Sequence, residues 1–305
     1  MKLKIFAILF LVLASTHFAH ATSREMLEYV PQNTMFVIGA DYDALRSSDV
    51  FVKLENEGRI WSFDKRNNLM PYLAALTLKP ADIQASVFTK YLNPYGTKGE
   101  FHLFQVSRDI SSHLSPKSST PYLGSKLYRI HTEHEDLFAT ILTPQIVALG
   151  SLSGVKSAID VMQGKGKHLK ENPTVFGLIE KVPQTAGVWG ISRPLSRREA
   201  ASKGTNQSTN TMLESFENYY FYGIPSPVAV RANFIGFAKS EGEATFVRTF
   251  MIGMVTFSKF RAGNDRVADA LDQITVDRNG KNIRVTAVVN QDLVNAYLNG
   301  EIGVE

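Results

Sequence analysis

Two short segments of this chain share a pattern, and their spacing constrains the fold more than any other feature. Residues 28–32 read Glu-Tyr-Val-Pro-Gln, and residues 180–184 read Glu-Lys-Val-Pro-Gln. Each segment is followed by an apolar run that ends in glycine, MFVIG at Gly39 and AGVWG at Gly190. The prolines, Pro31 and Pro183, are 152 residues apart, about half of the chain. Because each proline favours an extended entry into the next segment, we predict an internal duplication of a strand-and-helix unit.

Residues 1–21 have the features of a cleavable export signal. Lys2 and Lys4 form a basic start, residues 5–14 (IFAILFLVLA) are all apolar, and Ala19-His20-Ala21 fits the small-x-small cleavage pattern. This apolar run is too short for a membrane-spanning helix, which needs about twenty residues. We therefore predict cleavage after Ala21, a periplasmic or secreted mature protein, and no transmembrane span in it.

The composition of the mature chain excludes several classes of function. Without Lys2 and Lys4 it has 31 basic and 29 acidic residues, a formal charge of +2 that gives no field for binding nucleic acid. The chain has no cysteine, which excludes disulfides, thiol nucleophiles, thiolate metal sites and a lipid-anchoring cysteine. Packing alone must then stabilise the fold, which the length of the chain permits.

The pattern of apolar residues and turns predicts an α+β fold with two related halves, 22–177 and 178–305. Each half is expected to be a mainly antiparallel sheet covered on one face by helices. The expected strands are 35–42, 86–92, 100–106, 126–132, 137–143, 146–150, 188–192, 227–238, 270–276 and 283–289. The expected helices are 44–61, 154–162, 212–222, 247–255 and 292–298. The polar stretch 193–210 is expected to be a loop, and it contains Asn206 in a glycosylation sequon that matters only in a eukaryotic source.

Four runs in the chain resemble those of a group of exported bacterial proteins of unassigned function. They are YLGSKLYRI, TPQIVALGSLSGVKSAIDVMQGKG, NPTVFGLIEKVPQTAGVWGI and GKNIRVTAVVNQDLV. The resemblance covers most of the mature chain in order, and its motifs are structural. It implies an envelope or secreted location and a repeated α+β architecture, with no activity, cofactor or functional residue to carry over.

Three clusters that could carry chemistry are better explained by structure, so we predict no catalytic, cofactor-binding or metal-binding residue. Residues 131–136 (HTEHED) lack the convergent spacing of a zinc site and suit a charged hairpin. Ser153, in GSLSG, lacks the nucleophile-elbow order and suits a helix N-cap. Residues 164–170 (GKGKHLK) follow a helix instead of preceding one, which argues against a phosphate loop.

A run of aromatic residues before Gly223 is the best candidate for a ligand or interface site. Aromatic side chains at this density form binding platforms and interface anchors, although packing a helix onto its sheet also explains them. The candidate residues are Phe216, Tyr219, Tyr220 and Tyr222.

These observations favour an exported, non-enzymatic binding or structural protein of the cell envelope, whose partner is an envelope protein or an extracellular ligand. One alternative is an exported hydrolase with dispersed acidic catalytic residues, because paired carboxylates leave no local motif. Another is a self-assembling module that pairs through an exposed sheet edge. A hydrolase requires a deep pocket with ionisable groups, whereas a binding module requires a groove or apolar patch without them.

The export signal makes the first testable prediction. Expressed with its complete N-terminus in a bacterial host that carries signal peptidase, the protein should be recovered outside the cytoplasm and should begin at Thr22. Intact-mass measurement and N-terminal sequencing check this, and Ala19→Arg should block cleavage as a control. A mature protein that retains Met1 would contradict the prediction.

Overall fold

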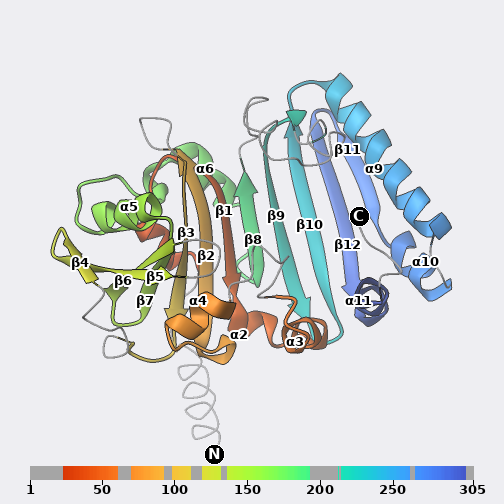
Figure 1. Cartoon of the computed structure of the whole chain (residues 1–305). Helices are drawn as coiled ribbons and strands as arrows, with labels where there is room; N and C mark the ends of the chain where they lie inside the picture. Colours follow the sequence, from red (N-terminus) through yellow and green to blue (C-terminus); the bar gives the residue numbers. More distant parts are fainter. Residues whose placement is uncertain are drawn as a thin grey trace, which may run out of the picture.

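The computed structural model describes residues 23–60, 70–92, 98–110, 119–131, 136–192, 212, 214–261 and 265–299. Within them, twelve strands form one antiparallel sheet in the order β11-β12-β10-β9-β8-β1-β2-β3-β7-β6-β5-β4 (Figure 1). The predicted signal peptide and the whole of the predicted loop 193–210, with Asn206, lie outside the described residues.

The bounds of the elements follow the chain. The strands are β1 (Thr34–Asp41), β2 (Ile83–Leu92), β3 (Lys98–Val106), β4 (Ser119–Tyr122), β5 (Ser125–His131), β6 (Asp136–Thr143), β7 (Ile146–Gly150), β8 (Val188–Ser192), β9 (Phe216–Ser226), β10 (Ala229–Ala238), β11 (Thr275–Asn279) and β12 (Asn282–Asn290). The α-helices are α2 (Tyr42–Leu45), α3 (Asp49–Asn56), α4 (Met70–Ala75), α5 (Leu152–Met162), α6 (Pro173–Ile179), α9 (Glu241–Arg261), α10 (Asp265–Asp272) and α11 (Gln291–Leu298). Three short 3₁₀ helices are η1 (Glu25–Tyr29), η2 (Pro80–Asp82) and η4 (Leu169–Glu171).

The α+β class is confirmed, but the strands form one continuous sheet and not a separate sheet in each half. The two parts of the chain meet where β1 pairs with β8, and Ile38 lies directly opposite Gly190. Pairings β1–β2 and β8–β9 then extend the sheet in both directions. The predicted boundary between residues 177 and 178 falls inside α6, and the division into two domains stays a prediction.

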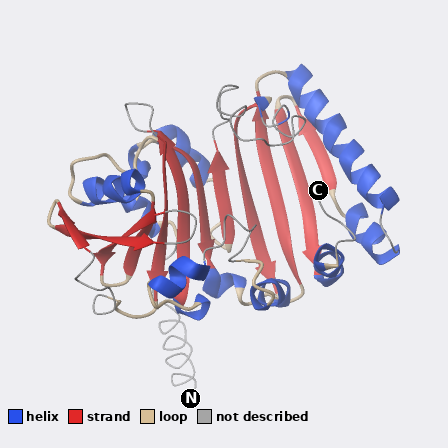
Figure 2. Ribbon diagram, in the orientation of Figure 1, coloured by secondary structure: helices blue, strands red, loops and turns tan. Residues whose placement is uncertain are grey.

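Helices cover parts of both faces of the sheet, whereas the sequence predicted helices on one face only (Figure 2). We call the two faces the α5 face and the α9 face. On the α5 face, side chains of η1, α5, η4 and α6 pack against Val37, Leu103 and Trp189 in the largest core cluster. On the α9 face, α2, α3 and α4 pack against the β3–β7 region, and α9 packs against Ile283 of β12.

A tryptophan that packs over a glycine stabilises the centre of the sheet. Gly39 of β1 lies directly opposite Trp189 of β8, and Trp189 is fully buried. A Cβ atom added to Gly39 would lie 2.3 Å from Cε2 of the indole. Because Gly39 has no side chain, the indole of Trp189 can extend from β8 over the backbone of β1. Aromatic side chains often cover strand glycines in this way.

The aromatic run is a strand, and the prediction of a helix over 212–222 is wrong. β9 covers Phe216–Ser226 and pairs with β8 on one side and β10 on the other. Aromatic side chains of β9 lie on both faces of the sheet, so the alternation of apolar and polar residues that signals a half-exposed strand is missing. Tertiary pairing decides the conformation of such a segment, since its local pattern is ambiguous.

Three other predicted elements differ from the structure in their bounds. The helix expected over 44–61 is divided into α2 and α3. The strand expected over 270–276 begins as the end of α10, and β11 starts only at Thr275. The N-cap of α5 is Ser151 and not Ser153, because the Ser151 hydroxyl accepts the Gly154 N–H at 3.1 Å. The remaining predicted strands are confirmed, and Gly164, with a positive φ of 68°, lies just after the end of α5.

The contact between Gly39 and Trp189 gives a stability prediction. Gly39→Ala should lower the free energy of unfolding by about 2 kcal/mol, because the new methyl group overlaps the indole. Gly177 of α6 is the matched control, since a Cβ atom there meets nothing within 4 Å. Gly177→Ala should raise the free energy by about 0.5–1 kcal/mol through its helix propensity. Urea unfolding of both variants checks this, and an equal loss in both would contradict it.

Candidate functional site

One row of directly opposed residues crosses all twelve strands on the α9 face. Because opposed residues in antiparallel strands share a face, the pairings define this row without reference to side-chain orientation. From β11 to β4 it consists of Val276, Val285, Phe234, Phe221, Gly190, Ile38, Phe88, His102, Leu149, Ala139, Tyr128 and Ser119. From Val276 to Ala139 the row is apolar or aromatic, and His102 is the one ionisable residue in that part. The row ends in Tyr128 and Ser119. An apolar band therefore runs across the α9 face of the sheet.

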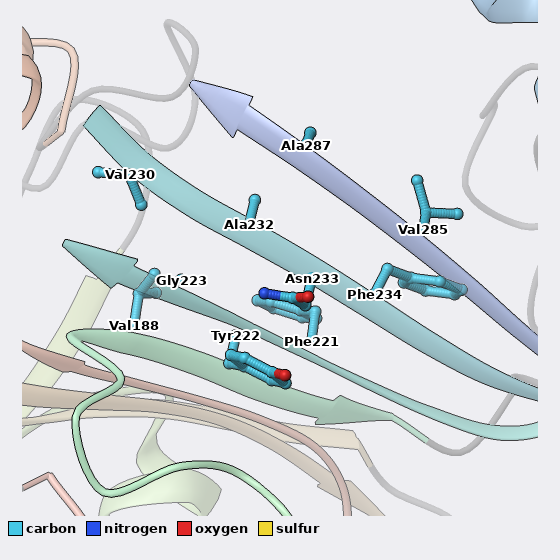
Figure 3. Close-up of a pocket in the computed structure, with 10 residues that line it drawn as sticks. All are labelled: Val188, Phe221, Tyr222, Gly223, Val230, Ala232, Asn233, Phe234, Val285 and Ala287. Carbon is cyan, nitrogen blue, oxygen red and sulfur yellow. The ribbon is translucent and has the colours of Figure 1, made fainter. Parts of the chain in front are cut away.

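A second row, beside the first, contains small residues and forms the floor of a trough. Val188 of β8 lies opposite Gly223 of β9, Gly223 lies opposite Ala232 of β10, and Ala232 lies opposite Ala287 of β12. Neighbouring strands are about 4.8 Å apart, so these four positions span roughly 14 Å across the sheet. Larger side chains border the floor, with Phe221, Phe234 and Val285 on one side and Val230 on the other (Figure 3).

The trough is an apolar cavity of about 220 Å³. Figure 3 shows its lining residues on three adjacent strands, β9, β10 and β12, with Val188 contributed by β8. Tyr222 and Asn233 complete the lining, and none of the lining residues carries a charge. Such a surface can hold hydrocarbon groups, but it offers neither an acid nor a base for catalysis.

The four aromatic residues predicted as a site are divided between the two faces of β9. Phe216 is fully buried and packs with Tyr219 under α9. Tyr220 is buried in the core of the α5 face, and Tyr222 contacts that core and lines the trough. Whether any of them binds a ligand stays a prediction. Phe221 belongs to the same aromatic run but is not one of the four candidates, because only its pairing with Gly190 reveals its place in the trough wall.

His102 lies in an aromatic stack on the α9 face. Its ring centroid is 4.6 Å from that of Phe88 and 5.7 Å from that of Phe104, and the latter pair is nearly parallel. Burial lowers the pKa of His102 to about 4, and the positive charge of Lys90 acts in the same direction, partly offset by Glu100. The imidazole is therefore neutral at pH 7, and the side chain is half-buried.

Asp41, a carboxyl group with a raised pKa, lies on the opposite face of the sheet from His102. Asp41 accepts hydrogen bonds from the Ser23 N–H at 2.6 Å and the Ser23 hydroxyl at 3.0 Å. Trp189 donates its Nε1–H to the same hydroxyl at 2.9 Å. Burial raises the pKa of Asp41, although the Ser23 bonds act against this shift. Asp41 and His102 thus cannot form an acid–base pair, because the sheet separates them.

The described residues contain no group of three or more metal-capable side chains. Residues 132–135 of the predicted charged hairpin lie outside this description. At its base, His131 Nδ1 lies 2.6 Å from Asp136 Oδ1, and Arg129 forms an ion pair with the same carboxylate. The Arg129 hydrogen bond lowers the pKa of Asp136. These contacts fit a surface ion-pair cluster at the β5–β6 hairpin.

Along the described part of the chain, no helix has both the length and the apolar character needed to cross a bilayer.

Comparisons with known proteins find only distant structural similarity. No protein-family model matches the chain, and no curated protein matches its sequence. Crystal form I of the treponemal protein TP0453 gives a TM-score of 0.49 with 9% identity, over 91% of this chain and 97% of that chain. Crystal form III of TP0453 gives 0.49 with 10% identity, over 90% of this chain and 98% of that chain. Form IV gives 0.47 with 10% identity, over 89% and 95%.

The depressed pKa of His102 predicts a pH-dependent stability. Its pKa is about 4 in the folded chain and about 6.5 when unfolded. The unfolded state therefore binds more protons between these values, and the free energy of unfolding falls as the pH drops from about 6.5 to 4. We expect His102 to contribute a loss of about 2 kcal/mol over this range, a value reduced for its partial exposure.

The measurement compares urea unfolding of the wild type and of His102→Phe, which keeps an aromatic ring in the stack. The difference between the two proteins should grow in favour of the variant as the pH falls. Asp41 has a raised pKa and changes stability in the opposite sense, but it is present in both proteins and cancels in the difference. Parallel pH profiles for the two proteins would contradict the prediction.

Proposed function

We propose that this chain is an exported, non-enzymatic binding protein of the cell envelope that holds apolar groups of a partner protein in the trough. The observation that carries the proposal is the row of Gly223, Ala232 and Ala287 between larger apolar side chains, with no charge in the lining. Hydrocarbon groups gain from leaving water on such a surface, at roughly 25 cal/mol per Å² of apolar area buried.

The size of the trough supports a partner protein over a free small molecule. Ligand pockets usually have volumes of roughly 300–1,000 Å³, and the trough, at about 220 Å³, is smaller. It suits one or two apolar side chains that project from a larger surface. Val188 and Val230 are partly exposed at its border, so an approaching segment can reach the floor from solvent.

The alternative of a hydrolase lacks a comparable observation. A hydrolase pocket needs ionisable groups that converge on one substrate, and the residues that line the trough include no Asp, Glu, His, Lys or Arg. The binding function is therefore preferred.

We also propose that the two halves of the sheet arose by duplication. Counted outward from the centre, β1-β2-β3-β7-β6 and β8-β9-β10-β12-β11 are arranged alike, and α5 follows β7 as α11 follows β12. A two-fold axis between antiparallel β1 and β8 would relate residues that face each other across it. Ile38 and Gly190 do face each other, and their separation of 152 residues equals that of Pro31 and Pro183.

Filling the floor of the trough tests the binding function. Ala232→Leu should lower the affinity for the apolar dye anilinonaphthalene sulfonate at least about fivefold, because the new side chain occupies the space between Val230 and Phe234. Dye fluorescence titrations on the folded mature protein measure this. A photo-crosslinking residue at Val230 should capture an envelope protein in a saturable manner, and capture should be lost in the Ala232→Leu background.

Val228→Asn provides the matched control. Val228 is 70% exposed in the turn between β9 and β10 and does not line the trough, so its replacement should leave dye binding unchanged. Thermal melts of all variants establish that each is folded. Dye affinity and crosslinking that persist unchanged in Ala232→Leu would overturn the proposed function.

A further inference from the structure

The long helix α9 packs on the sheet through only one of its sides. Ala244 and Val247 are buried against β10 and β12, and Met251 packs beside them. An amphipathic surface helix would present polar residues on the opposite side. In α9 the opposite side carries exposed phenylalanines beside Thr249 and Thr256, so this helix has a second surface suited to packing.

That second surface is a narrow stripe of aromatic residues with exposed rings. Phe246 is 48% exposed, Phe257 is 60% exposed and Phe260 is 89% exposed. Phe250 stacks on Phe246 with ring centroids 6.2 Å apart. With Gly253, these residues recur at intervals of 4, 3, 4 and 3 along α9. This is the spacing by which one helix packs along another, and we call these five residues the outer stripe.

The order of residue types in the outer stripe is the same in both directions along the helix. Gly253 is at its centre, with two phenylalanines on each side. When two such helices run antiparallel, Phe246 of one lies beside Phe260 of the other, and Phe250 lies beside Phe257. A Cβ atom at Gly253 would meet nothing within 4 Å, so the centre is open for the close approach of a second backbone.

The charges beside the outer stripe also match an antiparallel copy. Glu243 and Arg261 are 18 residues apart, which is five helical turns, so both lie on the same side of the stripe. Antiparallel packing about Gly253 brings Glu243 of each copy beside Arg261 of the other. Parallel packing would place the acidic ends together and align the two helix dipoles unfavourably.

We propose that two copies of this chain associate through antiparallel packing of their outer stripes, around a two-fold axis beside Gly253. The contact is isologous, since the same surface is used by both copies, and it closes as a dimer. One helix pair is a small interface, so reversible association at micromolar concentrations is expected. This proposal uses a different surface from the trough and does not depend on the proposed function.

Sedimentation of the folded mature protein between about 1 and 100 µM tests the association. The wild type should show a monomer–dimer equilibrium. Phe260→Ser should raise the dissociation constant at least about tenfold, whereas Leu152→Ser, at an exposed apolar position of α5, should leave it unchanged. Gly253→Leu should also weaken the dimer while leaving the melting temperature unchanged or higher, because leucine favours a helix.

The orientation is tested by charge reversal and crosslinking. Glu243→Arg and Arg261→Glu should each weaken the dimer, and the double variant should restore it. The chain has no cysteine, so a single introduced cysteine reports its own distance to its copy. Gly253→Cys should form a disulfide-linked dimer on oxidation, whereas Phe246→Cys should not, since its copies would lie about 21 Å apart along the axes.

Three results would overturn the proposal. A protein that stays monomeric at about 100 µM contradicts the association itself. Equal crosslinking through Gly253→Cys and Phe246→Cys contradicts the antiparallel arrangement. Co-sedimentation of a monomer with vesicles of phosphatidylethanolamine and phosphatidylglycerol, abolished by Phe260→Ser, would assign the outer stripe to a lipid surface instead of a second copy.

Discussion

The pairing of β1 with β8 is the interaction on which the rest of the structure depends. It joins strands from distant parts of the chain and makes one sheet from two sets of strands that would otherwise each end in an open edge. Trp189 stabilises this junction by lying over Gly39, and its Nε1–H reaches Ser23, which in turn binds Asp41. The first described residues of the chain are thereby held against the same junction.

A sheet of twelve strands has more apolar area than the helices of the described chain cover. On the α5 face, the side chains of η1, α5 and α6 form a continuous core with the central strands. On the α9 face, α2 packs on the central strands β1 and β2, α9 packs on β10, β11 and β12, and the trough lies over β8, β9, β10 and β12. Small residues such as Ala232 leave the trough open, because bulkier side chains at these positions would fill it. The trough is therefore a consequence of sheet width and residue size together.

The sequence predicts local elements well wherever one rule determines them. Asn279-Gly280 favours the tight turn between β11 and β12, and Gly164 favours the end of α5, in both places because glycine adopts a positive φ without strain. The identity of the N-cap was wrong because Ser151 and Ser153 fit the same local pattern, and only the contact of Ser151 with the Gly154 N–H distinguishes them.

Non-local pairing explains what the sequence could not predict. β9 was expected to be a helix because its aromatic residues lie on both faces of the strand and show no alternation with polar residues. The trough has no sequence signal either, since Gly223, Ala232 and Ala287 become neighbours only through the register of three strands. Conversely, the spacing of the outer stripe of α9 is visible in the sequence. The same spacing of apolar residues, however, is found on buried helix faces and on exposed ones. Exposure in the folded chain separates the two.

The trough and α9 are connected through residues that belong to both. Phe234 and Val285 line the trough, and the same side chains pack against the cluster that seats Val247 and Met251 of α9. One wall of the trough is thus set by how α9 lies on the sheet. Since packed side chains transmit small displacements to their neighbours, a contact that holds α9 in place also holds this wall. The proposed association through the outer stripe and the proposed binding in the trough use separate surfaces, but both surfaces rest on β10 and β12.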